Sequence, residues 1–143
     1  MIRATEFQIR VESNSPALHQ LCDIAIKAFH HSGHIFTPET DGLVKQLPDL
    51  LRKSGLQDVQ THAYTLECRA GTKEGQLFID DWTILYRIAE PFLQKWTQIP
   101  NTYQDIYQQM LKEIHQPDFV AVSHLLSVWG VRFSRFTSLA PRP

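Results

Sequence analysis

The chain has 143 residues, of which 43% are hydrophobic and 20% are charged, so it can bury one core and is too short to suggest two domains. Its 14 basic and 15 acidic residues leave a formal charge of −1, which does not favour nucleic acid or an anionic membrane as a partner. Two distant cysteines, the lack of a signal-peptide pattern and the lack of a membrane-length apolar stretch predict a cytoplasmic protein with free thiols.

The first predicted element is a strand over residues 2–12, because Phe7, Ile9 and Val11 alternate with polar residues. A helix is predicted to follow and to reach about residue 31. Ser15 can cap it, and Pro16 suits its first position, where a backbone N–H is not needed. Gly33 then offers the left-handed conformation that ends many helices.

The next elements are separated by turn residues. Residues 35–42 predict an ordered loop, and the leucines that follow predict a short amphipathic helix that ends near Gly55. Pro48 falls inside this helix and predicts a boundary or a kink. Residues 58–69 alternate between two sides again and predict a second strand.

The hydrophobic period changes to a helical one after Gly71. Two apolar stripes, one around Trp82 and one around Tyr107, predict two helices inserted over about residues 73–116. Residues 119–133 are rich in valine and predict a third strand, in which Gly130 marks a bulge or a point of twist.

Several phrases of the sequence resemble one known family. They are IRATE at 2–6, SNSPAL at 13–18, LLRKSGLQDV at 50–59, and PDF at 117–119 with VWG at 128–130. Together they resemble class I S-adenosylmethionine-dependent methyltransferases of the small-molecule type. In that family a fifth parallel strand leads to a helix, a phrase like the one at 50–59 leads into the sixth strand, and a final antiparallel strand follows. The similarity spans nearly the whole chain.

The resemblance implies an α/β fold that holds the last three strands of a Rossmann-like methyltransferase sheet, with the final strand antiparallel. The helices at about 73–116 would form a lid over the pocket, because the carboxyl ends of parallel strands are where ligands bind in such sheets. Residues 1–136 would form this C-terminal half-domain, and residues 137–143 would be a disordered tail.

The cofactor motif of the family is missing from this sequence. Its six glycines, at positions 33, 42, 55, 71, 75 and 130, include no G-x-G, so no cofactor-binding residue is assigned here. The first four strands of the family, which hold S-adenosylmethionine in the complete enzyme, would precede Met1. The resemblance therefore implies the substrate-side portion of a transferase that is inactive without the missing N-terminal half.

The candidate substrate-binding residues are Glu12, Asn14, His62, Trp82 and Tyr86. Glu12 and Asn14 follow the first strand and could orient or deprotonate an acceptor hydroxyl, although Asn14 also suits a helix cap. Trp82 and Tyr86 lie one turn apart and could stack on a flat acceptor, or else belong to the core. His62 faces either the pocket or solvent. No catalytic residue is assigned.

Metal binding is not predicted. His30 and His34 have the spacing of a helical zinc pair, but Gly33 interrupts the helix between them and no third ligand is evident nearby. The expected partners are a small-molecule methyl acceptor and either the missing half or a second copy. A different class of function remains open, in which the chain is a non-catalytic ligand-binding or dimerisation module that associates through the edge of its first strand.

Overall fold

The computed structural model describes residues 1–39 and 42–132 and shows four strands and four helices there. The strands are β1 (Ile2–Phe7), β2 (Glu12–Ser13), β3 (Gln57–Arg69) and β4 (Val120–Val131). The helices are α1 (Pro16–His31), α2 (Gly42–Lys53), α3 (Lys73–Trp96) and α4 (Tyr103–Ile114). The predicted α/β class is confirmed, and α3 and α4 occupy the predicted helical insertion.

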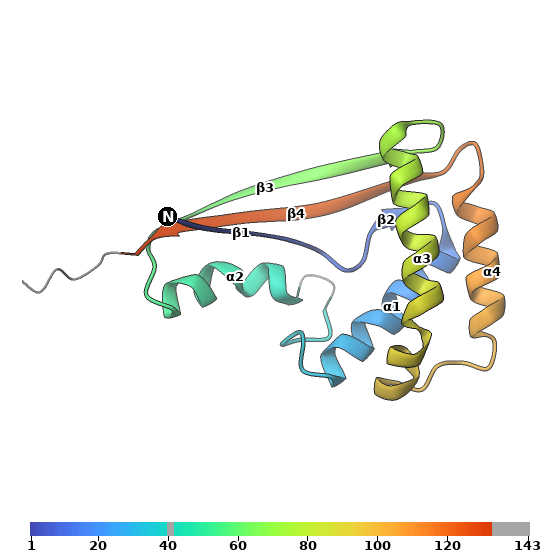
Figure 1. The fold of residues 1–143 in the computed structure, drawn as a ribbon, viewed down its shortest axis with the longest axis horizontal. Helices are drawn as coiled ribbons and strands as arrows, with labels where there is room; N and C mark the ends of the chain where they lie inside the picture. Colours follow the sequence, from blue (N-terminus) through green and yellow to red (C-terminus); the bar gives the residue numbers. More distant parts are fainter. Residues whose placement is uncertain (40–41, 133–143) are drawn as a thin grey trace, which may run out of the picture.

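The sheet is built around β4, the last strand of the described chain. β3 pairs with one side of β4, and β1 and β2 follow one another along its other side (Figure 1). Every one of these pairings is antiparallel. The final strand is therefore antiparallel as expected. β1 and β3 run in the same direction as each other, but they are not neighbours, because β4 lies between them.

The predicted first strand at 2–12 is divided in two, which corrects the sequence interpretation. Residues 8–11 leave the ladder between β1 and β2. Val11 is buried there in the same core as the helices, and Arg10 pairs with Asp23 of α1 at 3.0 Å. Burial of Val11 against α1 outweighs the simple alternation along the strand, and it opens a gap in the edge of the sheet.

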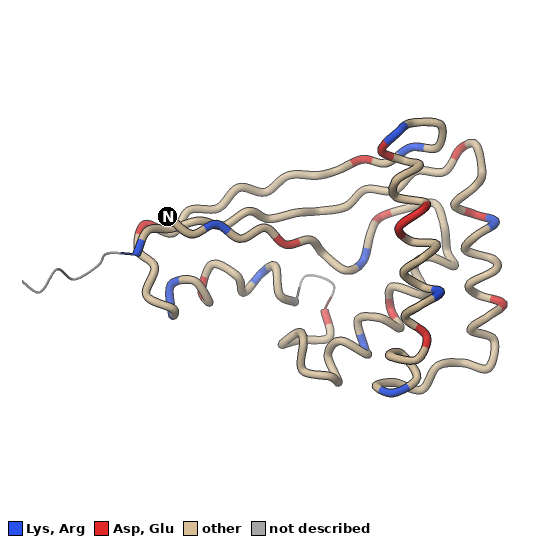
Figure 2. Tube along the Cα trace, in the orientation of Figure 1, with Lys and Arg blue, Asp and Glu red and all other residues tan. Residues whose placement is uncertain are grey.

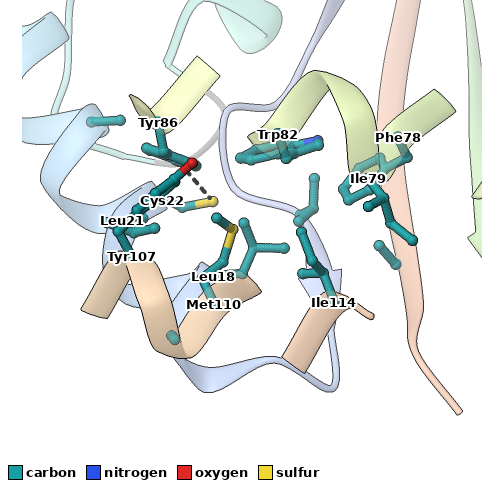
Figure 3. Close-up of a cluster of buried hydrophobic side chains, with 14 of the residues drawn as sticks. Leu18, Leu21, Cys22, Phe78, Ile79, Trp82, Tyr86, Tyr107, Met110 and Ile114 are labelled. Atoms are coloured by element: carbon teal, nitrogen blue, oxygen red, sulfur yellow. Dashed lines mark hydrogen bonds between the residues drawn. The ribbon is translucent and has the colours of Figure 1, made fainter. Parts of the chain in front are cut away.

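The main core lies at one end of the sheet, where α1, α3 and α4 pack together. Figure 3 shows leucines and Cys22 of α1 meeting the aromatic side chains of α3 and Met110 of α4. Two tyrosines also satisfy their hydroxyls here. Tyr103 Oη donates to the backbone oxygen of Tyr86 at 2.8 Å, and Tyr86 Oη donates to the sulfur of Cys22 at 3.5 Å. Burial raises the pKa of Tyr103 to about 12 and raises the pKa of the Cys22 thiol, so both stay protonated near neutrality.

The turn between β3 and α3 depends on Gly75. A Cβ atom at this position would overlap the carbonyl oxygen of Arg69, the last residue of β3. Thr72 caps α3 by accepting from the backbone N–H of Gly75 at 3.0 Å. The close approach of the first helical turn to the strand end therefore explains why glycine stands at position 75.

The helix around Pro48 differs from the expectation of a boundary, because α2 continues through this residue. Val44 and Leu47 of α2 are buried, and the helix contacts β1, β3 and β4. Packing of this apolar side against the sheet holds the helix across the missing N–H of Pro48.

The two faces of the sheet have different surroundings. One face carries Val128 and Gly130 and lies against α2 and Leu56. The other, which we call the open face, consists of alternate residues of β1, β3 and β4: Arg3, Thr5, Phe7, Gln60, His62, Tyr64, Leu66, Leu125, Ser127 and Trp129. Phe7, Tyr64 and Leu66 of this face are exposed.

Three predicted features fall partly or wholly outside the described residues. These are the tail at 137–143, positions 40 and 41 of the predicted loop, and position 133 at the end of the predicted third strand.

Candidate substrate pocket

A pocket of about 280 Å³ lies where the edge of the sheet is interrupted between β1 and β2. Its lining residues are Gln8, Arg10, Val11, Glu12, Ser13 and His19. The first five follow directly from the carboxyl end of β1, and His19 projects from the first turns of α1. Polar groups that accept or donate protons therefore converge on a small, partly open hollow, as in many ligand sites.

The central contact of this pocket joins Ser13 and His19. The backbone N–H of Ser13 donates to His19 Nε2 at 3.2 Å, so this ring nitrogen acts as an acceptor. The hydroxyl of Ser13 lies 3.1 Å from the same nitrogen and accepts from the N–H of Ser15 at 3.2 Å. When His19 carries its proton on Nδ1, the Ser13 hydroxyl and the Ser13 N–H share Nε2 as their acceptor. The pair has the contact that general-base catalysis requires.

Charged groups stand on both sides of this pair. Arg10 is held by Asp23 at 3.0 Å, and Glu12 contacts His124 Nε2 of β4 at 3.0 Å. All four side chains are at least partly exposed. The pocket therefore offers a small polar ligand one cationic and one anionic side chain without a strong net field.

The five predicted substrate-binding residues lie in three different places. Glu12 lines the pocket. Asn14 instead joins the β2–α1 turn to β4, since its amide donates to the Asp118 oxygen at 2.9 Å and accepts from the Val120 N–H at 3.1 Å. Of the two cap residues, Ser15 makes the predicted bond to the Leu18 N–H at 3.1 Å.

The aromatic candidates do not reach this pocket. Trp82 is 9% exposed and Tyr86 is 2% exposed, and their rings pack 5.3 Å apart within the core. His62 lies on the open face, where its ring stacks on Tyr64 at 5.9 Å. None of these three residues lines the Ser13–His19 pocket, because two belong to the core and one lies on a face of the sheet. Their role in substrate binding stays a prediction.

Residues 10–14 were predicted as the ligand-binding end of the first strand, but of the lining residues only Glu12 was predicted to bind substrate, and Gln8 and His19 were not anticipated. A signal for His19 was present, because it stands one turn after the Ser15 cap and six residues after Ser13. A short turn between a strand end and a helix brings such residues together.

The histidines that raised the metal question are engaged in local contacts. The ring of His30 lies 5.8 Å from the ring of His31, and His34 Nδ1 lies 2.7 Å from Ser32 Oγ. Within residues 1–39 and 42–132, no group of three or more histidine, cysteine or acidic side chains is placed to hold a metal ion.

A second hollow, also of about 280 Å³, lies beside Val44 of α2 and strands β3 and β4. It shares Gln8 with the first pocket and borders His124. Most of the side chains that line it are apolar or threonine, and no hydroxyl among its lining residues is hydrogen-bonded to an imidazole. The Ser13–His19 pocket is therefore the better candidate for chemistry.

The start of α1 is where an anionic group of a nucleotide-like cofactor could bind, because helix N-termini bind anions. Its N–H groups are already used by the chain itself. Glu113 of α4 accepts from Ser15 Oγ at 2.6 Å and from the Ala17 N–H at 3.0 Å, and Pro16 has no N–H to offer. The start of α1 is therefore already occupied by groups of the chain itself.

Glu113 is ionised in this position. Burial alone would raise the pKa of its carboxyl, but the hydrogen bonds from Ser15, Gln109 and the Ala17 N–H outweigh burial and lower the pKa. Near neutral pH a carboxylate therefore fills the anion position of α1, and it ties α4 to the turn that carries Ser13.

Comparison with known proteins gives no relative: no family model, no curated protein and no solved structure matches this chain. Among the helices of the described residues, none is both long enough and apolar enough to cross a lipid bilayer.

Proposed function

We propose that this chain is the C-terminal, substrate-side portion of an S-adenosylmethionine-dependent methyltransferase that acts on a small molecule. The observation that carries the proposal is the pocket at the carboxyl end of β1, where Ser13 is bonded to His19. This is the end of a strand at which the resemblance puts the acceptor. In this proposal the cofactor and the transfer step belong to a complementary half, because the sequence has no G-x-G motif for the cofactor.

In this proposal the pocket binds the acceptor and removes its proton. An acceptor hydroxyl or amine donates to Ser13 Oγ, whose own proton moves to His19 Nε2 along the existing 3.1 Å contact. The acceptor then carries the electron pair it needs as a nucleophile. Arg10 and Glu12 fix the orientation of polar groups on the acceptor.

The helical insertion, α3 and α4, supports the pocket through its contacts with α1. α3 and α4 pack on α1, which carries His19, and Glu113 of α4 bonds to Ser15, two residues beyond Ser13. α3 and α4, predicted to form a lid, contribute no residue to the lining of this pocket, so we propose that they hold its wall in place through α1. A fixed wall limits which acceptors fit and keeps the Ser13–His19 geometry constant.

The sheet supports the idea of a complementary half. Within the described residues, the outer edge of β1 has no strand partner, and apolar side chains of the open face are exposed. Additional strands at this edge and helices on this face would bury both. Cys22 and Cys68 are free and buried, which suits the reducing cytoplasm that we propose as the location.

The first experiment looks for the complementary half. The genomic sequence directly upstream is read for a frame that encodes a strand followed by G-x-G, and its product is expressed together with this chain. The mixture is supplied with tritiated S-adenosylmethionine and a panel of small hydroxyl and amine acceptors. Methyl transfer is expected only with both halves.

The second experiment tests the pocket within that active mixture. His19→Gln keeps an acceptor for the Ser13 N–H but takes no proton, and it is expected to lower kcat by roughly 10²-fold or more. His30→Gln, on the same helix and outside the pocket, is the matched control and should keep full activity.

Two results would contradict the proposal. One-to-one binding of S-adenosylmethionine by this chain alone, measured by calorimetry, would show that the cofactor site lies here. Full activity of His19→Gln would show that the acceptor is deprotonated elsewhere.

A further inference from the structure

Helix α3 has two apolar sides, and only one of them is used within the described structure. The first faces the core with Phe78, Trp82, Tyr86 and Leu93. The second faces solvent and carries Leu77, Ile84, Leu85 and Ile88, which are 56%, 48%, 45% and 64% exposed. We call these four residues the outer stripe. A helix that is apolar on opposite sides normally has a partner on each.

Three residues of the outer stripe, together with Asp81, have the spacing of a coiled-coil seam. Positions 77, 81, 84 and 88 are separated by four, three and four residues, and all but Asp81 are large and aliphatic. Positions 80 and 87 flank this seam on one side, seven residues apart, and hold Asp80 and Arg87. In Figure 2 acidic residues mark the N-terminal part of α3, and a basic residue and then a further acidic one follow along the helix.

The flanking charges are free to meet a partner. Arg87 is exposed and has no ion pair or hydrogen bond with any residue of the described chain. Asp80 is exposed and accepts from Gln76 at 2.8 Å, one turn earlier on the same helix. Neither charge is neutralised by an ion pair within the fold.

The charges also select the partner and its direction. If a second copy of α3 lies antiparallel, Leu77 of each helix meets Ile88 of the other, and Asp80 of each helix meets Arg87 of the other. If the two copies lie parallel, Asp81 faces the same residue of its partner in the seam, which is repulsive. In the antiparallel direction Asp81 faces Ile84 of the other helix instead of a like charge, so the antiparallel direction, which permits two-fold symmetry, is favoured over the parallel one.

We propose that two copies of this chain form a dimer through antiparallel pairing of the outer stripes of α3. The dimer would bury the four exposed aliphatic residues of each copy and form two Asp80–Arg87 pairs across the two-fold axis. Because the outer stripe contains no pocket residue, the dimer can form whether or not the chain is part of a methyltransferase.

The test is sedimentation equilibrium of the full chain over a concentration series. The wild-type chain is expected to dimerise reversibly. Ile84→Asp is expected to give a monomer, and circular dichroism checks that it stays folded. Phe36→Ser removes an exposed aromatic residue outside α3 and should leave the dimer intact.

Charge exchange distinguishes this contact from general apolar association. Asp80→Arg alone and Arg87→Asp alone are each expected to weaken the dimer about tenfold or more, because each creates two repulsive pairs. The double variant with both exchanges should recover most of the wild-type affinity. A chain that is monomeric at every concentration would overturn the proposal, and so would a dimer that survives Ile84→Asp or is lost in Phe36→Ser.

Discussion

Apolar residues are buried at the helical end of the molecule, whereas several on the open face of the sheet are exposed to solvent. At the helical end, Leu18, Met110 and Ile114 come from different parts of α1 and α4 and have no exposed surface. On the open face, Phe7 is 56% exposed, Leu66 is 46% exposed and Tyr64 is 38% exposed. Both regions are ordered, but only the first encloses its own core.

This difference separates the region that stabilises the fold from the surfaces that are available for association. Burial of apolar surface between α1, α3 and α4 supplies a core that does not depend on other chains. The open face and the outer stripe of α3 keep comparable residues in contact with water, and exposed apolar patches of this kind are typical of interaction sites. The pocket lies between the two regions, at the point where Val11 leaves the strand for the core.

The largest expected effect is on the helical end. Leu18→Ala removes a fully buried side chain and should lower the free energy of unfolding by about 2–5 kcal/mol, because it leaves a cavity between α1 and its neighbours. Urea denaturation followed by circular dichroism measures the change. Leu18→Met, which keeps the volume, should cost less than about 1.5 kcal/mol. A loss below about 1 kcal/mol for the alanine variant would mean that this core is not the main source of stability.

A smaller effect is expected at the link between the core and the pocket. Glu113→Gln weakens the bonds to Ser15 Oγ and the Ala17 N–H and should cost about 1–2 kcal/mol at neutral pH. Asp105→Asn changes an exposed carboxyl in the first turn of the same helix and should cost less than about 0.5 kcal/mol.

The effect of Glu113→Gln on the free energy of unfolding depends on pH in a characteristic way. The folded-state pKa of Glu113 is lowered, so its stabilising contribution is complete above the unfolded value of 4.5 and is lost as the pH falls through the folded-state pKa. The difference in unfolding free energy between wild type and Glu113→Gln should therefore shrink on acidification. A difference that grows below this pH would show that Glu113 is protonated in the folded protein.

Much of the fold follows from local sequence patterns. The alternation at 58–69, the Ser15–Pro16 start of α1 and the two apolar stripes after Gly71 each correspond to an observed element. The pairing of the strands could not be predicted from these patterns, because alternation shows which residues of a strand share a face but not which other strand is its neighbour in the sheet. The split of residues 2–12 was also missed, since it depends on the contact of Val11 with a helix that follows it.

The candidate site was harder to predict than the fold. Glu12 was placed correctly near a strand end, whereas Trp82 and Tyr86 were chosen for their ring chemistry and lie in the core. Helical spacing cannot tell a core stripe from a ligand-binding one, and α3 carries apolar residues on both sides. His19 was overlooked because its partner, Ser13, lies on another element, and only the turn between β2 and α1 brings them together.

The smallest expected effect is on the open face. Phe7→Ser should change the free energy of unfolding by less than about 0.5 kcal/mol, because its ring is already largely in water. Phe119→Ser is the matched change at a buried phenylalanine of the core and should cost several kcal/mol, on the order of 3–5. Urea denaturation of both variants at low protein concentration makes the comparison direct. If Phe7→Ser cost as much as Phe119→Ser, the open face would have to be covered in solution. In that event the difference between Phe7→Ser and the wild type should shrink on dilution, because the covering partner then dissociates from the wild type.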